Sequence, residues 1–179
     1  KSGGLAVNIR RVFMFFDTSG ISIAPSSATL EVYGFSGNDS DVIVVKSDAA
    51  DPLVNGGFND LAGASTALSN SDGSGTGTLS GVSGLTYSSE IATWNTSGYN
   101  HITLNSTALS DMASLDTFKI CIMDYDYDYL DTAPSPGFSS PSRAGMWWAD
   151  SLGTSRDPYI DYTAGVAITD NAIFFGTNF

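Results

Sequence analysis

The sequence has little of what most catalytic and metal-binding sites are built from. Its 179 residues include a single cysteine, Cys121, and a single histidine, His101. One cysteine excludes an intrachain disulfide, and zinc sites need clusters of cysteine or histidine that this chain lacks. No G-x-S-x-G turn offers a nucleophile for a Ser–His–Asp arrangement around His101. These absences lead us to expect a protein that is not an enzyme.

Basic residues are also scarce. Lysine and arginine number 7 against 19 aspartates and glutamates, which gives a formal net charge of −12. Such a chain repels phosphate backbones and anionic membranes, whereas calcium ions and neutral glycans remain compatible partners. No apolar run reaches the roughly 18 residues that a membrane-spanning helix needs. We expect no nucleic-acid partner and no insertion into a membrane.

Charged residues make up only 15% of the chain, so much of its surface must consist of serine, threonine, asparagine and glycine. Such a surface is typical of extracellular and virion β-proteins, and we expect one of these two locations. No signal peptide is visible, and the first residue is Lys1. We interpret the sequence as a processed, trimmed or partial chain.

The abundant residues predict β-structure. Short runs of β-branched and aromatic residues lie between glycine, serine, aspartate and proline, a pattern typical of an all-β sandwich. The expected strands are residues 9–16, "ATLEVYGF", "DVIVVKS", "YNHITLN", "FKICIMDY", "AGMWWAD" and "DPYIDYT". We expect residues 1–165 to form a single domain, with a short helix within Asn105–Leu115 and a surface loop or weak hairpin over Leu61–Leu85.

The order of several motifs resembles DNRLRE-type domains. "RRVFMFFDTSGI" is followed by "SSATLEVYGF", then by "YNHITLN", "FKICIMDYDYDYLD" and "MWWADSLGTSRDPYIDYTAG", over roughly residues 10–163. The resemblance implies a jelly-roll-like β-sandwich of secreted, cell-surface and virion proteins, often linked to polysaccharide binding. Such domains usually carry one or two strands before the first motif and end near the last. Here only "KSGGLAVN" precedes the basic-aromatic motif, and 14 residues follow Gly165.

The C-terminal extension, residues 166–179, is apolar and strand-like. A jelly roll that lacks a strand exposes unpaired backbone groups, which a strand from another subunit can pair with. We expect the extension to be such a donor strand and to assemble copies of the chain head-to-tail into a filament or ring. Two alternatives stay open: the extension fills its own domain, or it is a remnant. The short N-terminus could also be the donor. The assembly residues are Ile168, Ala172, Ile173, Phe174, Phe175 and Phe179.

The stretch "MDYDYDYLD" contains a possible calcium site. Asp124, Asp126 and Asp128 recur at a spacing of two, and Asp131 follows closely. On a strand the first three carboxylates would share one face, where a calcium ion with its six to eight oxygen ligands would bridge them. The alternative is a solvated acidic strand end. A loop that resembles an EF-hand is also possible, although its glycine and terminal glutamate are missing.

Aromatic residues in and after this stretch could stack on sugar rings. Tyr127, Tyr129 and Trp148 are the candidates for binding a glycan, since flat rings cover the apolar faces of pyranoses. The alternative is a structural role. Adjacent Trp147 and Trp148 should point to opposite faces of a sheet, so one of them is expected in the core. Cys121 is also expected to be a buried core residue.

Two further features concern single side chains. The sequons at Asn38, Asn95 and Asn105 predict surface positions that a glycosylating pathway could modify. Alternation along the first strand sends either Arg10 or Arg11 inward, where it needs a carboxylate partner. The candidates for that partner are Asp17 and an acid of the "DYDYDY" stretch.

Together these features predict a non-enzymatic extracellular or virion subunit that assembles by strand exchange, with calcium as a possible stiffening ion. The alternative is a carbohydrate-binding module that attaches a phage, cell or enzyme to polysaccharide. A third interpretation is an accessory domain cut from a larger enzyme.

Overall fold

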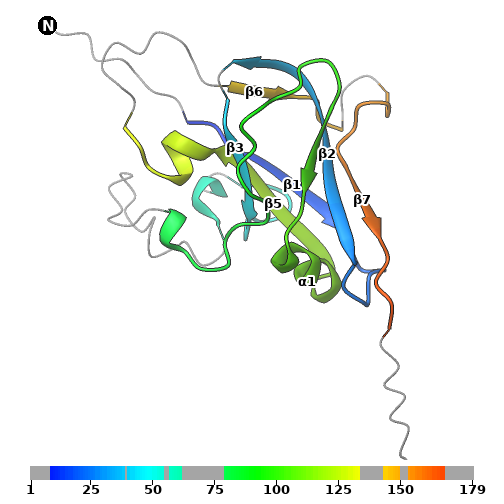
Figure 1. Ribbon diagram of the computed structural model, residues 1–179. Helices are drawn as coiled ribbons and strands as arrows, with labels where there is room; N and C mark the ends of the chain where they lie inside the picture. Colours follow the sequence, from blue (N-terminus) through cyan, green and yellow to red (C-terminus); the bar gives the residue numbers. More distant parts are fainter. Residues whose placement is uncertain are drawn as a thin grey trace, which may run out of the picture.

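The computed structural model describes residues 9–38, 40–54, 57–61, 79–133, 143–149 and 153–167. In these ranges the strands form two antiparallel sheets, which confirms the expected all-β sandwich (Figure 1). The first sheet has the order β1 (Val12–Asp17), β5 (Thr117–Asp124) and β3 (Val42–Lys46). The second sheet consists of β4 (Tyr99–Thr103), β2 (Ser27–Asn38), β6 (Arg143–Met146) and β7 (Tyr159–Thr163). A jelly-roll connectivity stays a prediction.

β2 is the long central strand of the second sheet. Residues 29–31 of β2 pair with β4 and also with β7, so these two strands lie on opposite edges of β2. β6 pairs with the last residues of β2, beyond an irregularity between Gly34 and Ser36. The Trp147 N–H, directly after β6, donates to the Tyr33 oxygen.

Alternating residues of the two sheets build the main core between them. Leu30 and Val32 of β2, Ile102 of β4, and Ile120 of β5 are fully or almost fully buried in one hydrophobic cluster. Leu30 and Val32 are two residues apart in β2, as residues on one face of a strand are. The inner face of the sandwich therefore follows directly from the strand pattern.

The outer face of the first sheet is buried as well. Val45, Cys121 and Met123 belong to a second cluster, in which segments after β3 and β5 contribute Leu61, Leu85 and Tyr129. Two short 3-10 turns, η1 (Gly57–Asn59) and η2 (Leu79–Gly81), belong to this layer. The expected core position of Cys121 is confirmed, and burial raises the pKa of its thiol. Of the expected loop over Leu61–Leu85, residues 62–78 lie outside the described residues.

The expected short helix is confirmed as α1 (Ser106–Ser114), which lies at one end of the sandwich (Figure 1). Asn105 is its N-cap: the side-chain oxygen accepts from the Ala108 N–H at 3.1 Å. The Asn105 amide nitrogen donates to the Thr86 oxygen at 2.7 Å, which ties the helix to the segment beside β3. The helix buries Ala108 and Met112 in the main core.

The "DYDYDY" stretch is not a strand, and this expectation was wrong. β5 ends at Asp124, and Tyr125–Tyr129 form a π-helical turn, η3. The Asp124 carboxylate accepts from the Tyr127 N–H at 2.7 Å, as a cap does. The turn therefore removes the alternation that would have placed three carboxylates on one face.

The prediction that one arginine points inward to an acid of this stretch is confirmed. The Arg11 Nε donates to Asp128 Oδ2 at 2.8 Å, and Nη2 donates to Oδ1 at 2.6 Å. The two side chains are only 3% and 4% exposed. The pair fixes η3 against the residue that precedes β1.

The C-terminal extension is described only at its start. Val166 is 86% exposed, and the following residue is exposed as well. The assembly residues Ile168, Ala172, Ile173, Phe174, Phe175 and Phe179 lie outside the described residues. No helix in the described ranges is long and apolar enough to cross a membrane.

Candidate functional site

The second sheet has an open edge along β4. The Gly98 oxygen accepts from the Gly34 N–H of β2, and the Leu104 N–H donates to the Ala28 oxygen of β2. Because backbone groups alternate in direction along a strand, those of Tyr99, His101 and Thr103 face away from β2. Within the described part of the chain, no backbone group pairs with those of His101 and Thr103. This edge can accept another strand.

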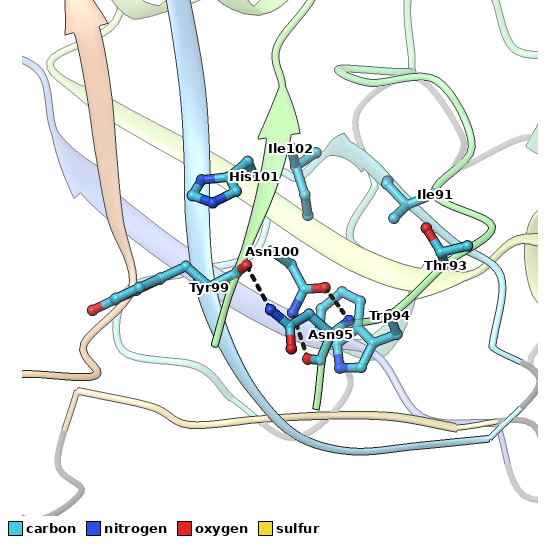
Figure 2. Close-up of a pocket in the computed structure, with 8 residues that line it drawn as sticks. All are labelled: Ile91, Thr93, Trp94, Asn95, Tyr99, Asn100, His101 and Ile102. Atoms are coloured by element: carbon cyan, nitrogen blue, oxygen red, sulfur yellow. Dashed lines mark hydrogen bonds between the residues drawn. The ribbon is translucent and has the colours of Figure 1, made fainter. Parts of the chain in front are cut away.

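A groove of about 500 Å³ lies beside this open edge (Figure 2). Ile91 and Thr93 line it across from β4, and Trp94 and Asn95 close one end. The backbone of Ile91 pairs with Val42 of β3, so this wall belongs to the edge of the first sheet. The groove thus lies on the side of the sandwich where the two sheet edges face each other, and no strand among the described residues bridges them.

The groove is apolar at its base and polar at its rim. Ile91 and Trp94 pack against the main core from this side, next to the buried Ile102. Thr93 and Asn95 are exposed and supply hydroxyl and amide groups. Apolar side chains of a strand laid along β4 would enter the base, while its backbone would meet the open edge.

Asn100 of β4 holds the end wall in place. Its side chain accepts from the Asn95 N–H at 2.7 Å and donates to the Asn95 oxygen at 3.0 Å (Figure 2). The Trp94 indole donates to the Gly145 oxygen at 3.1 Å. A Cβ atom added to Gly34 would overlap the Asn95 oxygen, so only glycine allows the chain to cross β2 this closely. These hydrogen bonds and the close approach to β2 therefore fix the position of the end wall.

The outer face of the second sheet carries a series of aromatic side chains. Ring centroids are 5.4 Å apart for Tyr159 and Tyr99, 5.2 Å for Tyr99 and Tyr33, and 5.2 Å for Trp147 and Phe35. The Arg156 guanidinium connects the two groups, because it lies 5.1 Å from the ring centroids of both Tyr33 and Trp147. We call these six residues the aromatic series.

Ionisable groups accompany the aromatic series. The Glu31 side chain is 7% exposed, and its Oε2 lies 2.6 Å from Nδ1 of the exposed His101. Partial burial, together with the nearby Tyr159 hydroxyl and Asp157 carboxylate, raises the pKa of the Tyr99 hydroxyl. Asp157 Oδ1 is buried and has no hydrogen-bond partner in the described part of the chain. Acceptor groups thus lie around Tyr99.

The predicted glycan platform is not assembled as expected. Tyr129 is buried in the second cluster, and its ring stacks on Tyr125 at 5.6 Å. Trp148 is 63% exposed and Tyr127 is half-buried, but neither joins the aromatic series. The expectation that Trp147 or Trp148 is a core residue was wrong, because β6 ends at Met146, which takes the buried position.

Three of the four predicted calcium ligands have separate roles or positions. Asp128 pairs with Arg11, Asp124 caps η3, and Asp131 has a positive φ of 54° after the turn. Among the described residues no group of three or more His, Cys, Asp or Glu side chains could hold a metal ion. Calcium binding by Asp124, Asp126, Asp128 and Asp131 stays a prediction, which thermal unfolding with calcium and with a chelator would test.

Two of the three sequon asparagines make hydrogen bonds with their side chains. The exposed Asn95 side chain accepts from the Ser97 N–H at 3.0 Å and donates to the Tyr99 oxygen at 3.4 Å. The Asn105 side chain caps α1, as described above. Asn38 is the last residue of β2. Glycosylation of Asn38, Asn95 and Asn105 stays a prediction.

Sequence reasoning did not find the groove or the aromatic series. Alternation along β2 and β4 places Tyr33 and Tyr99 on outer faces, which was a usable signal. Their contact depends on the register between strands, and Trp147 and Arg156 join from segments outside the strands. A single sequence does not contain that register.

Comparisons with known protein families, with curated proteins and with solved structures return no match for this chain. The resemblance to DNRLRE-type domains therefore stays a prediction that rests on the quoted motifs.

Proposed function

We propose that the chain is a non-enzymatic structural subunit that assembles by strand exchange on an extracellular or virion surface. The observation that carries this proposal is the open edge of β4 beside an apolar-based groove. Strand addition needs both parts, since the backbone edge supplies hydrogen bonds and the groove receives alternate side chains. We assign the groove along β4 as the acceptor.

The donor in this proposal is residues 168–179 of a second copy. Alternation in a strand would place Ile173, Phe175 and Phe179 on one face and Phe174 on the other. Burial of three or four of these large side chains would contribute roughly 6–10 kcal/mol before ordering costs. Association and ordering cost roughly 4–15 kcal/mol, so the backbone hydrogen bonds along β4 have to contribute as well.

The position of the chain exit is compatible with exchange between copies and with closure within one copy. β7, after which the extension begins, lies on the edge of β2 opposite to β4, and Val166 is already 86% exposed. To reach its own groove the extension would have to cross three strand spacings, about 14 Å. Twelve residues can span about 40 Å, so closure within one copy is the competing arrangement.

Donor and acceptor are different segments of the chain, so donation from one copy to the next would be a head-to-tail contact. Such a contact repeats from copy to copy and gives rings when the rotation closes, or filaments when it does not. The net charge of −12 keeps unassembled copies apart in solution.

Electron microscopy of the intact chain, beside a chain that ends at Gly165, tests the proposal. The expected result is filaments or rings for the intact chain and monomers for the shorter one. Thr103→Pro in the intact chain removes an outward N–H without touching the pairing with β2, and an edge strand tolerates proline at such a position. Thr103→Val retains the N–H and is the matched control.

We expect Thr103→Pro to remain folded and monomeric, whereas Thr103→Val assembles normally. Polymers formed by Thr103→Pro would place the contact on another surface. Monomers for the intact chain and for Thr103→Val would sink the proposal.

A further inference from the structure

We propose that the aromatic series on the outer face of the second sheet binds a neutral polysaccharide. The series consists of Tyr159, Tyr99, Tyr33, Arg156, Trp147 and Phe35, in which each neighbouring pair lies 5.1–5.4 Å apart. This face is distinct from the groove's base and does not involve the C-terminal extension. Tyr99 belongs to this series and also lines the groove, so the test below separates the two proposals with the Thr103→Pro variant.

The two ends of the series present ring surface to solvent. Tyr159 is 47% exposed at one end, and Phe35 is 48% exposed at the other. Monomeric proteins rarely leave large contiguous apolar patches exposed unless the patch binds something. Exposed rings at separate positions on one face suit an extended ligand with repeated apolar faces, as a chain of pyranose units has.

Hydrogen-bonding groups lie along the same face. The Tyr33 hydroxyl donates to the Ser97 oxygen at 2.8 Å, and the Tyr99 hydroxyl donates to the Ser155 oxygen at 3.1 Å, which holds both rings in place. The Asp157 carboxylate can accept from a sugar hydroxyl, and the guanidinium of the exposed Arg156 can donate to one. Rings held in place together with donors and acceptors are the features of a sugar site.

Charge decides which polysaccharide fits. With a net charge of −12, and with Glu31 and Asp157 beside the rings, the protein repels a polyanion. Arg156 is the single cation within the aromatic series, and its guanidinium lies 5.1 Å from the ring centroids of both Tyr33 and Trp147. A neutral polymer avoids the repulsion, and its hydroxyl groups can still bond to the Arg156 guanidinium and to the carboxylates.

Native gel electrophoresis in gels that contain one polymer each tests the proposal. The probes are hydroxyethyl cellulose, galactomannan and dextran, with alginate as the acidic polymer. The full chain should migrate more slowly with at least one neutral polymer and unchanged with alginate. The Thr103→Pro variant of the full chain is measured alongside, because a polymer of subunits would raise the apparent affinity by avidity.

Single substitutions at the exposed ends of the series make the test specific. Tyr159→Ala and Phe35→Ala should each weaken binding about tenfold or more, because each removes one stacking ring. Trp148→Ala is the matched control, since this tryptophan is 63% exposed and lies outside the series. It should bind like the unchanged chain.

Three results would overturn the proposal. One is normal migration in all three neutral polymers. Another is a loss of binding in Trp148→Ala that equals the loss in Tyr159→Ala. The third is self-association of the Thr103→Pro chain that disappears with Tyr159→Ala and Phe35→Ala, which would make this face a protein interface.

Discussion

Arg11 and Asp128 are 117 residues apart in the sequence and form a bidentate ion pair that is almost completely buried. The pair connects the start of β1 to η3, and the Arg11 Nη1 also donates to Asn59 at 3.1 Å. Three segments thus meet at one guanidinium.

Asp128→Asn tests this connection. Loss of one partner from a buried ion pair leaves an uncompensated charge, so we expect a decrease of about 3–5 kcal/mol in the free energy of unfolding. Urea denaturation measures it. Asp126→Asn in the same turn is the control and should change stability by less than about 0.5 kcal/mol. Equal effects of the two substitutions would contradict this role for Arg11.

Gly34→Ala tests the close crossing of the end wall over β2. The added methyl group would overlap the Asn95 oxygen, and we expect a loss of about 1–3 kcal/mol from overpacking. Gly20→Ala is the control, because a Cβ atom at Gly20 meets nothing within 4 Å. Thermal unfolding compares the two, and an unchanged melting temperature for Gly34→Ala would refute the described crossing.

Asn105→Ala tests the cap of α1. The substitution removes the bond to the Ala108 N–H and the bond to the Thr86 oxygen, so we expect a loss of about 1–2 kcal/mol. Ser110→Ala, at an exposed position of the same helix, should leave stability nearly unchanged. Chemical denaturation followed by circular dichroism measures both variants.

The Cys121 thiol should be unreactive in the folded protein. Burial raises its pKa, and the reactive species is the thiolate. We expect a disulfide reagent to label Cys121 only after denaturant is added. The folded state disfavours the thiolate, so the free energy of unfolding does not depend on Cys121 below the unfolded-state thiol pKa of about 8.5. Above that pH the unfolded chain loses the thiol proton while the folded chain keeps it, and the free energy of unfolding falls. Rapid labelling of the native chain at pH 8 would show that Cys121 is accessible.

The strands and the helix could be predicted because their signals are local. Alternation in "ATLEVYGF" and the polar start of α1 at Asn105 are present in a few neighbouring residues. The same rule failed at "DYDYDY", where alternating Asp and Tyr imitate a strand. There the Asp124 cap and the Arg11–Asp128 pair favour a turn instead.

The candidate sites depend on contacts between distant segments. The groove exists because the segment that contains Ile91 pairs with β3 while β4 pairs with β2. The aromatic series needs the register that sets Tyr33 opposite Tyr99. Neither pairing has a local signal. The donor segment stays a prediction from the sequence, and the acceptor groove could be proposed only from the structure.

The most direct test of strand exchange is a disulfide between two different chains. The acceptor chain ends at Gly165 and contains Thr103→Cys. The donor chain has the full C-terminal extension and contains Thr103→Pro, which blocks its own groove. Three versions of it are made, each with one cysteine, at Ala172, Phe174 or Gly176. In a strand these three positions would face the same side as Thr103. The buried Cys121 should take no part.

We predict a covalent dimer of one acceptor and one donor chain for at least one of the three positions. An intact chain that carries Thr103→Cys and the tail cysteine together should then form covalent multimers. If that chain instead forms only an internal disulfide as a monomer, and the mixed chains do not cross-link, the extension closes its own sandwich and the assembly account is wrong.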